Sequence, residues 1–134
     1  MTELLENALS KLMSFCEAEG FKGYDTYDAH KSFLPLSIFP HFFRFAITQV
    51  NKKSPVNLRP LLGIKKNYHT KAIGLFLAGY CNLFKLTKDE KYLKQTNSFI
   101  DWIEHNTSSF SENVCWGFDY YYTSRKKLVD KGLP

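Results

Sequence analysis

The sequence predicts an all-α domain built from antiparallel helical hairpins. Two observations predict this class. Apolar residues recur every three or four positions in four separate segments, which is the period of a helix with one buried face. The two clearest segments, 73–84 and 92–103, are joined by a short connector, so their helices must turn back on each other. A length of 134 residues suits one such domain.

The first helix is expected around residues 5–16. Its apolar stripe runs from Leu5 to Cys16 at helical spacing, and Glu19 and Gly20 supply a stop, because glycine readily adopts the left-handed conformation that ends a helix. Cys16 lies on this stripe and is therefore interpreted as a small core residue rather than a nucleophile.

The second helix is expected over residues 36–51, with an apolar face wider than one stripe. Pro40 has no backbone N–H and is tolerated only in the first turn, so the helix should begin near Ser37 or after it. Phe45 falls off the main stripe. This pattern predicts that the helix is covered on more than one side.

The third and fourth helices form the clearest unit. One apolar stripe runs from Ile73 to Phe84, and the other runs from Tyr92 to Ile103. Thr70 is a candidate N-cap for the third helix. Thr87 and Glu90 have the spacing of a capping box at the start of the fourth, in which hydroxyl and carboxylate each accept a backbone amide.

Two segments lack helical periodicity. Residues 21–35 join the first two helices, and residues 107–134 form an irregular tail. The tail is rich in aromatic rings, namely Phe110, Trp116, Phe118, Tyr120, Tyr121 and Tyr122. A solvated tail would not carry so many rings, so we expect it to pack on this chain or on a partner.

Composition and charge narrow the classes of function. The net charge is +5, but the lysines form short scattered pairs rather than the dense stripe of a nucleic-acid surface. Nucleic-acid binding is therefore disfavoured, and an anionic sugar or nucleotide-sugar would suit the charge better. No apolar run reaches the ~18 residues that a membrane span needs. We expect a cytoplasmic protein that does not enter a membrane.

Neither a metal site nor a cofactor motif is expected. The three cysteines are far apart, and the four histidines lack the spacing of zinc ligands. Gly-rich phosphate loops and the GxSxG elbow are also absent from the sequence. The prediction is accordingly no metal and no cofactor.

The loop of residues 23–32 is the first place where chemistry could lie. It holds Asp25 and Asp28 three positions apart, together with Tyr24, Tyr27 and His30. Paired carboxylates could act as acid and base if burial raises one pKa. Aromatic rings beside carboxylates also suit a sugar, because rings stack on its apolar face and carboxylates accept hydrogen bonds from its hydroxyls. The alternative is that Asp25 or Asp28 caps a short helix and the tyrosines only pack beneath the loop.

A second candidate is the stretch of residues 116–125, which combines rings with Asp119 and Arg125. Gly117 could permit a turn or a close backbone approach, and Arg125 could hold a carboxylate or phosphate with two parallel hydrogen bonds. The alternative is a packing tail with an Asp119–Arg125 ion pair.

Four runs together resemble the N-terminal part of a family associated with polysaccharide biosynthesis. They are residues 24–32, 53–63, 71–80 and 115–120, reading YDTYDAHKS, KSPVNLRPLLG, KAIGLFLAGY and CWGFDY. Some members of this family carry a delta-aminolevulinic acid dehydratase label. The family resembles the six-hairpin-glycosidase type of α/α toroid. Where relatives often show Asn-Pro-Lys-Gly before the third helix, this chain has His69-Thr70-Lys71-Ala72.

The resemblance implies a toroid and a set of positions at the loop end of its ring. Six hairpins need roughly 200 residues or more at about 11–12 residues per helix, so four helices predict a truncated or incomplete toroid. A second copy or a partner chain could complete its core. The positions carried over are Asp25, Tyr27, Asp28, Arg59, Lys71, Trp116, Asp119 and Arg125.

Two functions follow as hypotheses. The first is a carbohydrate-linked protein, which binds a saccharide or an anionic sugar or is a remnant glycan-active toroid. In an enzyme of this kind Asp28 and Asp119 are the candidate acid and base; the binding candidates are Asp25, Tyr27, Arg59, Lys71, Trp116 and Arg125. The second is a helical protein-interaction module without enzymatic activity. Delta-aminolevulinate dehydration is rejected, because it uses a lysine on an α/β barrel and this pattern provides no such strands.

Overall fold

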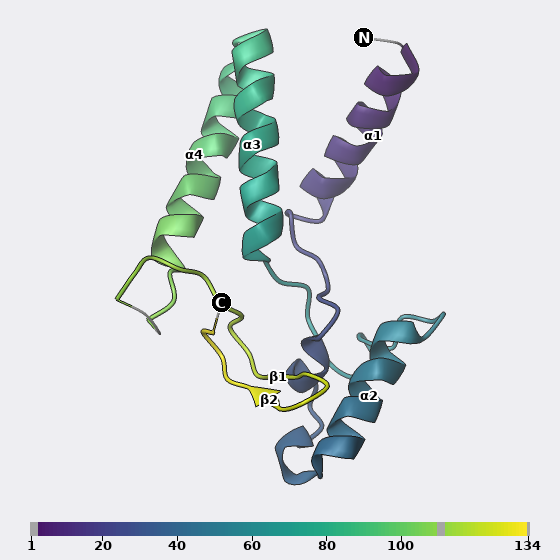
Figure 1. The fold of residues 1–134 in the computed structure, drawn as a ribbon. Coiled ribbons are helices and arrows are strands. Elements are labelled where there is room, and N and C mark those ends of the chain that lie inside the picture. Colours follow the sequence, from purple (N-terminus) through teal and green to yellow (C-terminus); the bar gives the residue numbers. More distant parts are fainter. Residues whose placement is uncertain (1–2, 110–111, 134) are drawn as a thin grey trace.

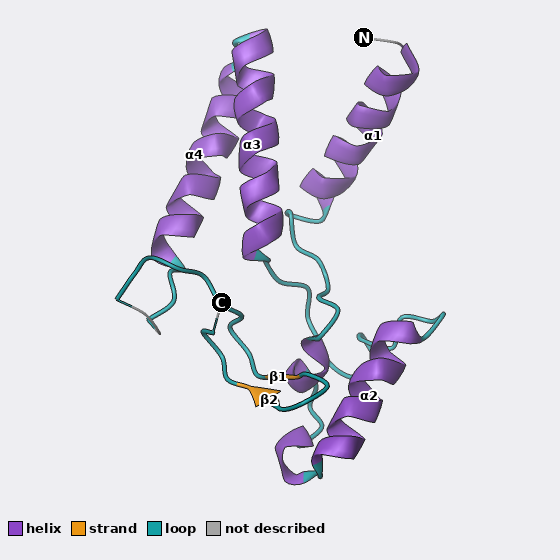
Figure 2. Cartoon of the chain, viewed as in Figure 1, coloured by secondary structure: helices purple, strands orange, loops and turns teal. Residues whose placement is uncertain are grey.

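Helices dominate the fold, which confirms the all-α class. The computed structural model describes residues 3–109 and 112–133. Along the chain lie α1 (Glu3–Ala18), η1 (Asp28–Lys31), η2 (Leu36–Ile38), α2 (His41–Lys53), α3 (Thr70–Thr87), α4 (Glu90–His105), β1 (Tyr122–Thr123) and β2 (Leu128–Val129). The elements named η are short 3₁₀ helices (Figure 2). In the described residues the only sheet is the antiparallel pair β1–β2 in the tail.

The elements form two groups (Figure 1). The α3–α4 hairpin occupies one end of the molecule with α1 beside it, while α2 lies at the other end near η1 and the β1–β2 pair. Loops between residues 19 and 69 pass from one group to the other. The junction of the two groups is where the candidate site is found.

The larger core lies between α3 and α4. Ile73, Tyr80 and Phe99 are buried there, and Met13 of α1 packs against them. Phe21 completes this core, with its ring centroid 4.9 Å from that of Phe99 in an edge-to-face arrangement. Gly20 has a φ of 58°, so the predicted glycine stop after α1 is confirmed, and the reversal places Phe21 against α3 and α4.

The α3–α4 hairpin turns back on itself as predicted, but the residues that cap its two helices are not the predicted ones. Thr70 is the first residue of α3 rather than its cap, and the N-cap of α4 is Asp89, whose carboxylate accepts the amide of Lys91 at 3.0 Å. The predicted capping box is therefore wrong. Because α3 continues through Thr87, the hydroxyl of this residue donates to the Leu83 carbonyl inside its own helix.

The predicted second helix divides into η2 and α2. Phe39 and Pro40 both have extended ψ values, 149° and 154°. Phe39 is extended because a residue that precedes proline is pushed out of the helical region. The prediction that α2 is covered on more than one side is wrong for the described residues. Thr48 and Asn51 are its buried side chains, and Phe42 and Phe43 are exposed.

The aromatic tail packs on its own chain, which is one of the two outcomes expected for it. Trp116 donates its indole N–H to the Ile103 carbonyl at 2.9 Å, and the Phe118 ring contacts the rings of His69 and Tyr122. Phe110 lies outside the described residues. Gly117 meets the backbone of Gly132 and Leu133 so closely that a Cβ atom would overlap it, which confirms the predicted close approach.

Gly117→Ala should destabilise the tail by about 1–3 kcal/mol, because the added methyl group would overlap backbone that has no rotamer to change. Gly79→Ala is the matched control. Nothing lies within 4 Å of a Cβ atom there, so alanine should instead stabilise α3 by about 0.5–1 kcal/mol. Urea unfolding monitored by tryptophan fluorescence measures both changes. Equal stability of the two variants would contradict this packing.

Candidate functional site

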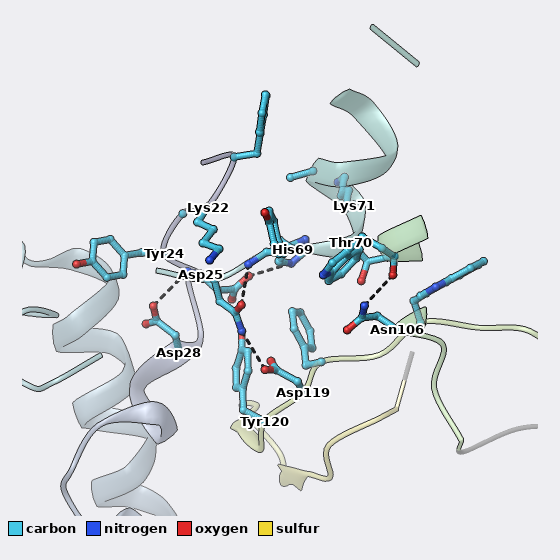
Figure 3. A pocket seen from close by; sticks show the side chains of 18 of the residues that line it. Lys22, Tyr24, Asp25, Asp28, His69, Thr70, Lys71, Asn106, Asp119 and Tyr120 are labelled. Atoms are coloured by element: carbon cyan, nitrogen blue, oxygen red, sulfur yellow. Dashed lines mark hydrogen bonds and ion pairs between the residues drawn. The ribbon is translucent and has the colours of Figure 1, made fainter. Parts of the chain in front are cut away.

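A cavity of about 700 Å³ lies at the junction of the two groups of elements. Its walls come from four parts of the chain: the end of α1 and the loop after it, the segment leading into α3 with the first two turns of that helix, the C-terminal end of α4, and the tail (Figure 3). Rings from all four parts line it, namely Phe15, Phe21, Tyr24, Tyr68, Phe76, Trp102, Trp116, Phe118 and Tyr120. The two loops that the sequence singled out therefore share one cavity.

Five of the eight predicted positions line this cavity, namely Asp25, Asp28, Lys71, Trp116 and Asp119. The other three do not. Tyr27 packs its ring against Tyr122, with centroids 5.9 Å apart, and Arg59 lies behind Asp28. Arg125 is exposed in the turn between β1 and β2. A binding role for Arg125 in this cavity is thus not supported by its position.

Asp28 is held by a buried network. Its carboxylate accepts the Arg59 Nε–H at 2.9 Å on Oδ2 and 3.1 Å on Oδ1, and it accepts the Asn51 amide at 3.0 Å. Only 2% of Asp28 is exposed. Burial raises the pKa of Asp28 above its ordinary value, although the Arg59 guanidinium acts in the opposite direction. Arg59 also donates to the Asp25 carbonyl at 2.9 Å, which fixes the loop between the two acids.

Asp25 links this loop to the start of α3. One carboxylate oxygen accepts the Tyr27 amide at 2.8 Å, and the other lies 2.9 Å from Nε2 of His69. The alternative in which an aspartate caps the short helix η1 is wrong, because no side chain caps that helix. Asp25 instead forms a local turn and reaches across the cavity wall to His69 (Figure 3).

Asp119 pairs with a residue far away in the sequence. Its carboxylate lies 2.9 Å from the Lys31 ammonium and accepts the Asn67 amide at 3.0 Å. The expected ion pair with Arg125 is therefore wrong. The tail approaches the loop after α1 instead, so the nearest cation comes from η1. The Asp119 side chain is 63% exposed, so this pair adds little stability.

Sequence reasoning missed Tyr120 as a site residue. Tyr120 is 8% exposed and lines the cavity, and within residues 3–109 and 112–133 its hydroxyl makes no hydrogen bond of ordinary length and angle. Burial, followed by the interaction of the hydroxyl with the adjacent Asp25 carboxylate, raises the pKa of Tyr120. The i, i+2 spacing of Phe118, Tyr120 and Tyr122 could have indicated the shared face, because alternate residues of an extended segment point the same way.

The backbone of His69 occupies the N-cap position of α3, but its side chain makes no capping hydrogen bond. The ring lies 5.5 Å from the ring of Phe118 and contacts Asp25. Asn67, which precedes it by two residues, joins the Gly23 backbone by two hydrogen bonds of 3.0 and 2.9 Å. The segment before α3 is thus tied to the loop after α1.

Among residues 3–109 and 112–133, no three histidines, cysteines or acids lie close enough together to hold a metal ion. In the same part of the chain, no helix has the length and apolar character to cross a membrane.

Comparison with known proteins leaves the geometry as the basis for assigning a function. The chain matches no family model, no curated protein and no solved structure.

Arg59→Ala should destabilise the protein by about 3–5 kcal/mol, because it leaves the Asp28 carboxylate buried without its cation. Adding Asp28→Asn to this variant should recover part of the loss, since the remaining side chain is neutral. Thermal and urea unfolding of the two single variants and the double variant form the necessary cycle. Costs that simply add would show that the two groups do not stabilise each other.

Proposed function

We propose that this chain binds a saccharide in the cavity at the junction of its two groups of elements. The observation that carries the proposal is the composition of the wall. Aromatic rings, which stack on the apolar faces of sugars, surround the Asp25–His69 contact and the unpartnered hydroxyl of Tyr120. Mostly apolar walls with a few converging polar groups are typical of small-molecule sites, and the volume of about 700 Å³ is within their usual range.

The polar groups suit sugar hydroxyls, which both donate and accept hydrogen bonds. A buried hydroxyl without a partner is costly in the free protein, and a ligand that bonds to it removes that cost. The Asp25 carboxylate beside it can only accept. A sugar hydroxyl beside Tyr120 would give its hydroxyl a hydrogen-bond partner, which an apolar ligand would not.

A glycan-active role extends this proposal. Asp28 and Asp119 line the same cavity, and the raised pKa of Asp28 is the property required of a general acid. Both carboxylates are held by cations, Asp28 by Arg59 and Asp119 by Lys31. If Asp28→Asn and Asp119→Asn variants process oligosaccharides as the wild type does, neither residue takes part in the reaction.

Tyr120→Phe should weaken saccharide binding roughly tenfold, because it removes one hydrogen bond to the ligand. The same change should leave the free protein equally or more stable, since the lost hydroxyl has no partner. Tyr121→Phe, at the exposed neighbouring position, is the control and should change neither quantity. Glycan-array screening selects the sugar, and calorimetric titration with thermal unfolding measures the variants. Unchanged binding by Tyr120→Phe would refute this role of the hydroxyl.

A helical interaction module is the second candidate, favoured by the apolar side chains that α1 and α2 expose. Leu12 and Phe15 of α1 are 58% and 63% exposed, and Phe42 of α2 is 73% exposed. In this case light scattering should give a mass above the 15.6 kDa of one chain, and Phe42→Ser should lower it. Leu86→Ser, at an exposed position of α3, is the control. A strict monomer that captures no second chain would count against this candidate.

A further inference from the structure

The charged groups around the cavity are unequally partnered. Four carboxylates line it, and each has a basic side chain in contact: Glu19 with Lys66, Asp25 with His69, Asp28 with Arg59 and Asp119 with Lys31. Lys22, Lys65 and Lys71 also line the cavity, and none of them makes an ion pair with any residue that the structure describes. Three of the four carboxylates therefore contact a lysine or an arginine, Asp25 contacts a histidine that is charged only when protonated, and three lysines of the wall have no carboxylate partner in the described part of the chain.

The start of α3 adds to this positive potential. Thr70, Lys71 and Ala72 line the cavity, and the first amide with a helical acceptor is that of Ile73, which donates to the His69 carbonyl at 2.9 Å. The side chain of His69 does not cap the helix. Within the described ranges the amides of residues 70–72 have no backbone acceptor, and the dipole of an 18-residue helix favours an anion at this end.

A second, independent feature indicates a ligand at the same place. The hydroxyl of Tyr120 is unpartnered, and the side chain is more than nine-tenths buried. Figure 3 shows Tyr120 pointing toward Asp25, whose carboxylate contacts His69, the residue immediately before α3. Tyr120 and the first residues of α3 line the same cavity, so one ligand could contact both.

We propose that the cavity takes an acidic saccharide, with its carboxylate or phosphate group at the first turn of α3 and Lys71. This inference rests on the proposed function and specifies its ligand class. The hydroxyls of the sugar lie on the side of Asp25 and Tyr120, and its acidic group lies on the side of Lys71 and the start of α3 (Figure 3). Ammonium and backbone N–H donors both form charge-assisted hydrogen bonds with such a group.

Three sugars that differ only at carbon 6 test whether the ligand is an acidic saccharide: glucose, glucuronate and glucose 6-phosphate. Titration into ¹⁵N-labelled full-length protein should move the amide resonances of residues 70–72 with both acidic sugars and with inorganic phosphate, but not with glucose. The acidic sugars should bind at least about tenfold more tightly than glucose. Comparison of the two acidic sugars distinguishes a carboxylate from a phosphate as the preferred group.

Lys71→Gln should lower the affinity for the preferred acidic sugar roughly tenfold and reduce its dependence on salt, and this loss should be several times larger than any loss of affinity for glucose. Lys85→Gln is the matched control, because Lys85 is exposed on the same helix and lies outside the cavity. It should have no effect on either sugar.

The outcomes separate the two proposals. Equal affinity for glucose and glucuronate with no effect of Lys71→Gln would overturn the anionic group and leave saccharide binding intact. Movement of the amides of residues 70–72 with phosphate alone, and with no sugar in a full glycan screen, would support the anion site and refute the saccharide. Failure of phosphate and of both acidic sugars to move these amides would overturn the inference.

Discussion

The buried pair of Asp28 and Arg59 is the interaction on which the rest of this structure depends. It joins the short helix η1 to the segment after α2, and Asn51 of α2 completes it from a third direction. Arg59 also holds the Asp25 carbonyl, and Asp25 in turn reaches His69 at the start of α3. One network of charges therefore connects the two groups of elements. Burial makes the Arg59 side of the Asp28 pair costly to remove, because the Asp28 carboxylate would be left without its cation where water cannot solvate it.

Loops rather than helices build the cavity that this network positions. The α3–α4 hairpin supplies a rigid wall through its aromatic core, and the loop after α1 and the tail are fixed to that wall by few contacts. The Gly23–Asn67 backbone bridge, the Asp25–His69 contact and the Trp116 indole bond are the main ones. A site of this kind can have a firm geometry at one side and adapt at the other, which suits recognition of a polar ligand.

The two groups bury their residues in opposite ways. The α3–α4 hairpin buries rings and aliphatic side chains, as the spacing of its apolar residues predicts. In α2 the buried side chains are Thr48 and Asn51, and large apolar residues are exposed. Periodicity shows which residues share a face, but it does not show which face turns inward. In α2 the face that carries Thr48 and Asn51 turns inward, and the Asn51 amide donates a hydrogen bond to the buried Asp28 carboxylate there.

The sequence by itself determined the class of fold, the existence and order of the four main helices, the glycine stop after α1 and the two loops that line the cavity. These features depend on local spacing and on the backbone freedom of single residues, which a sequence contains directly. Only the tertiary structure decided which side chains of the chain contact one another. Asp119 pairs with Lys31 rather than Arg125, Arg59 pairs with Asp28, and Tyr120 is buried in the cavity wall. Contacts between residues so far apart in the chain depend on how the two groups pack, and no local pattern records that packing.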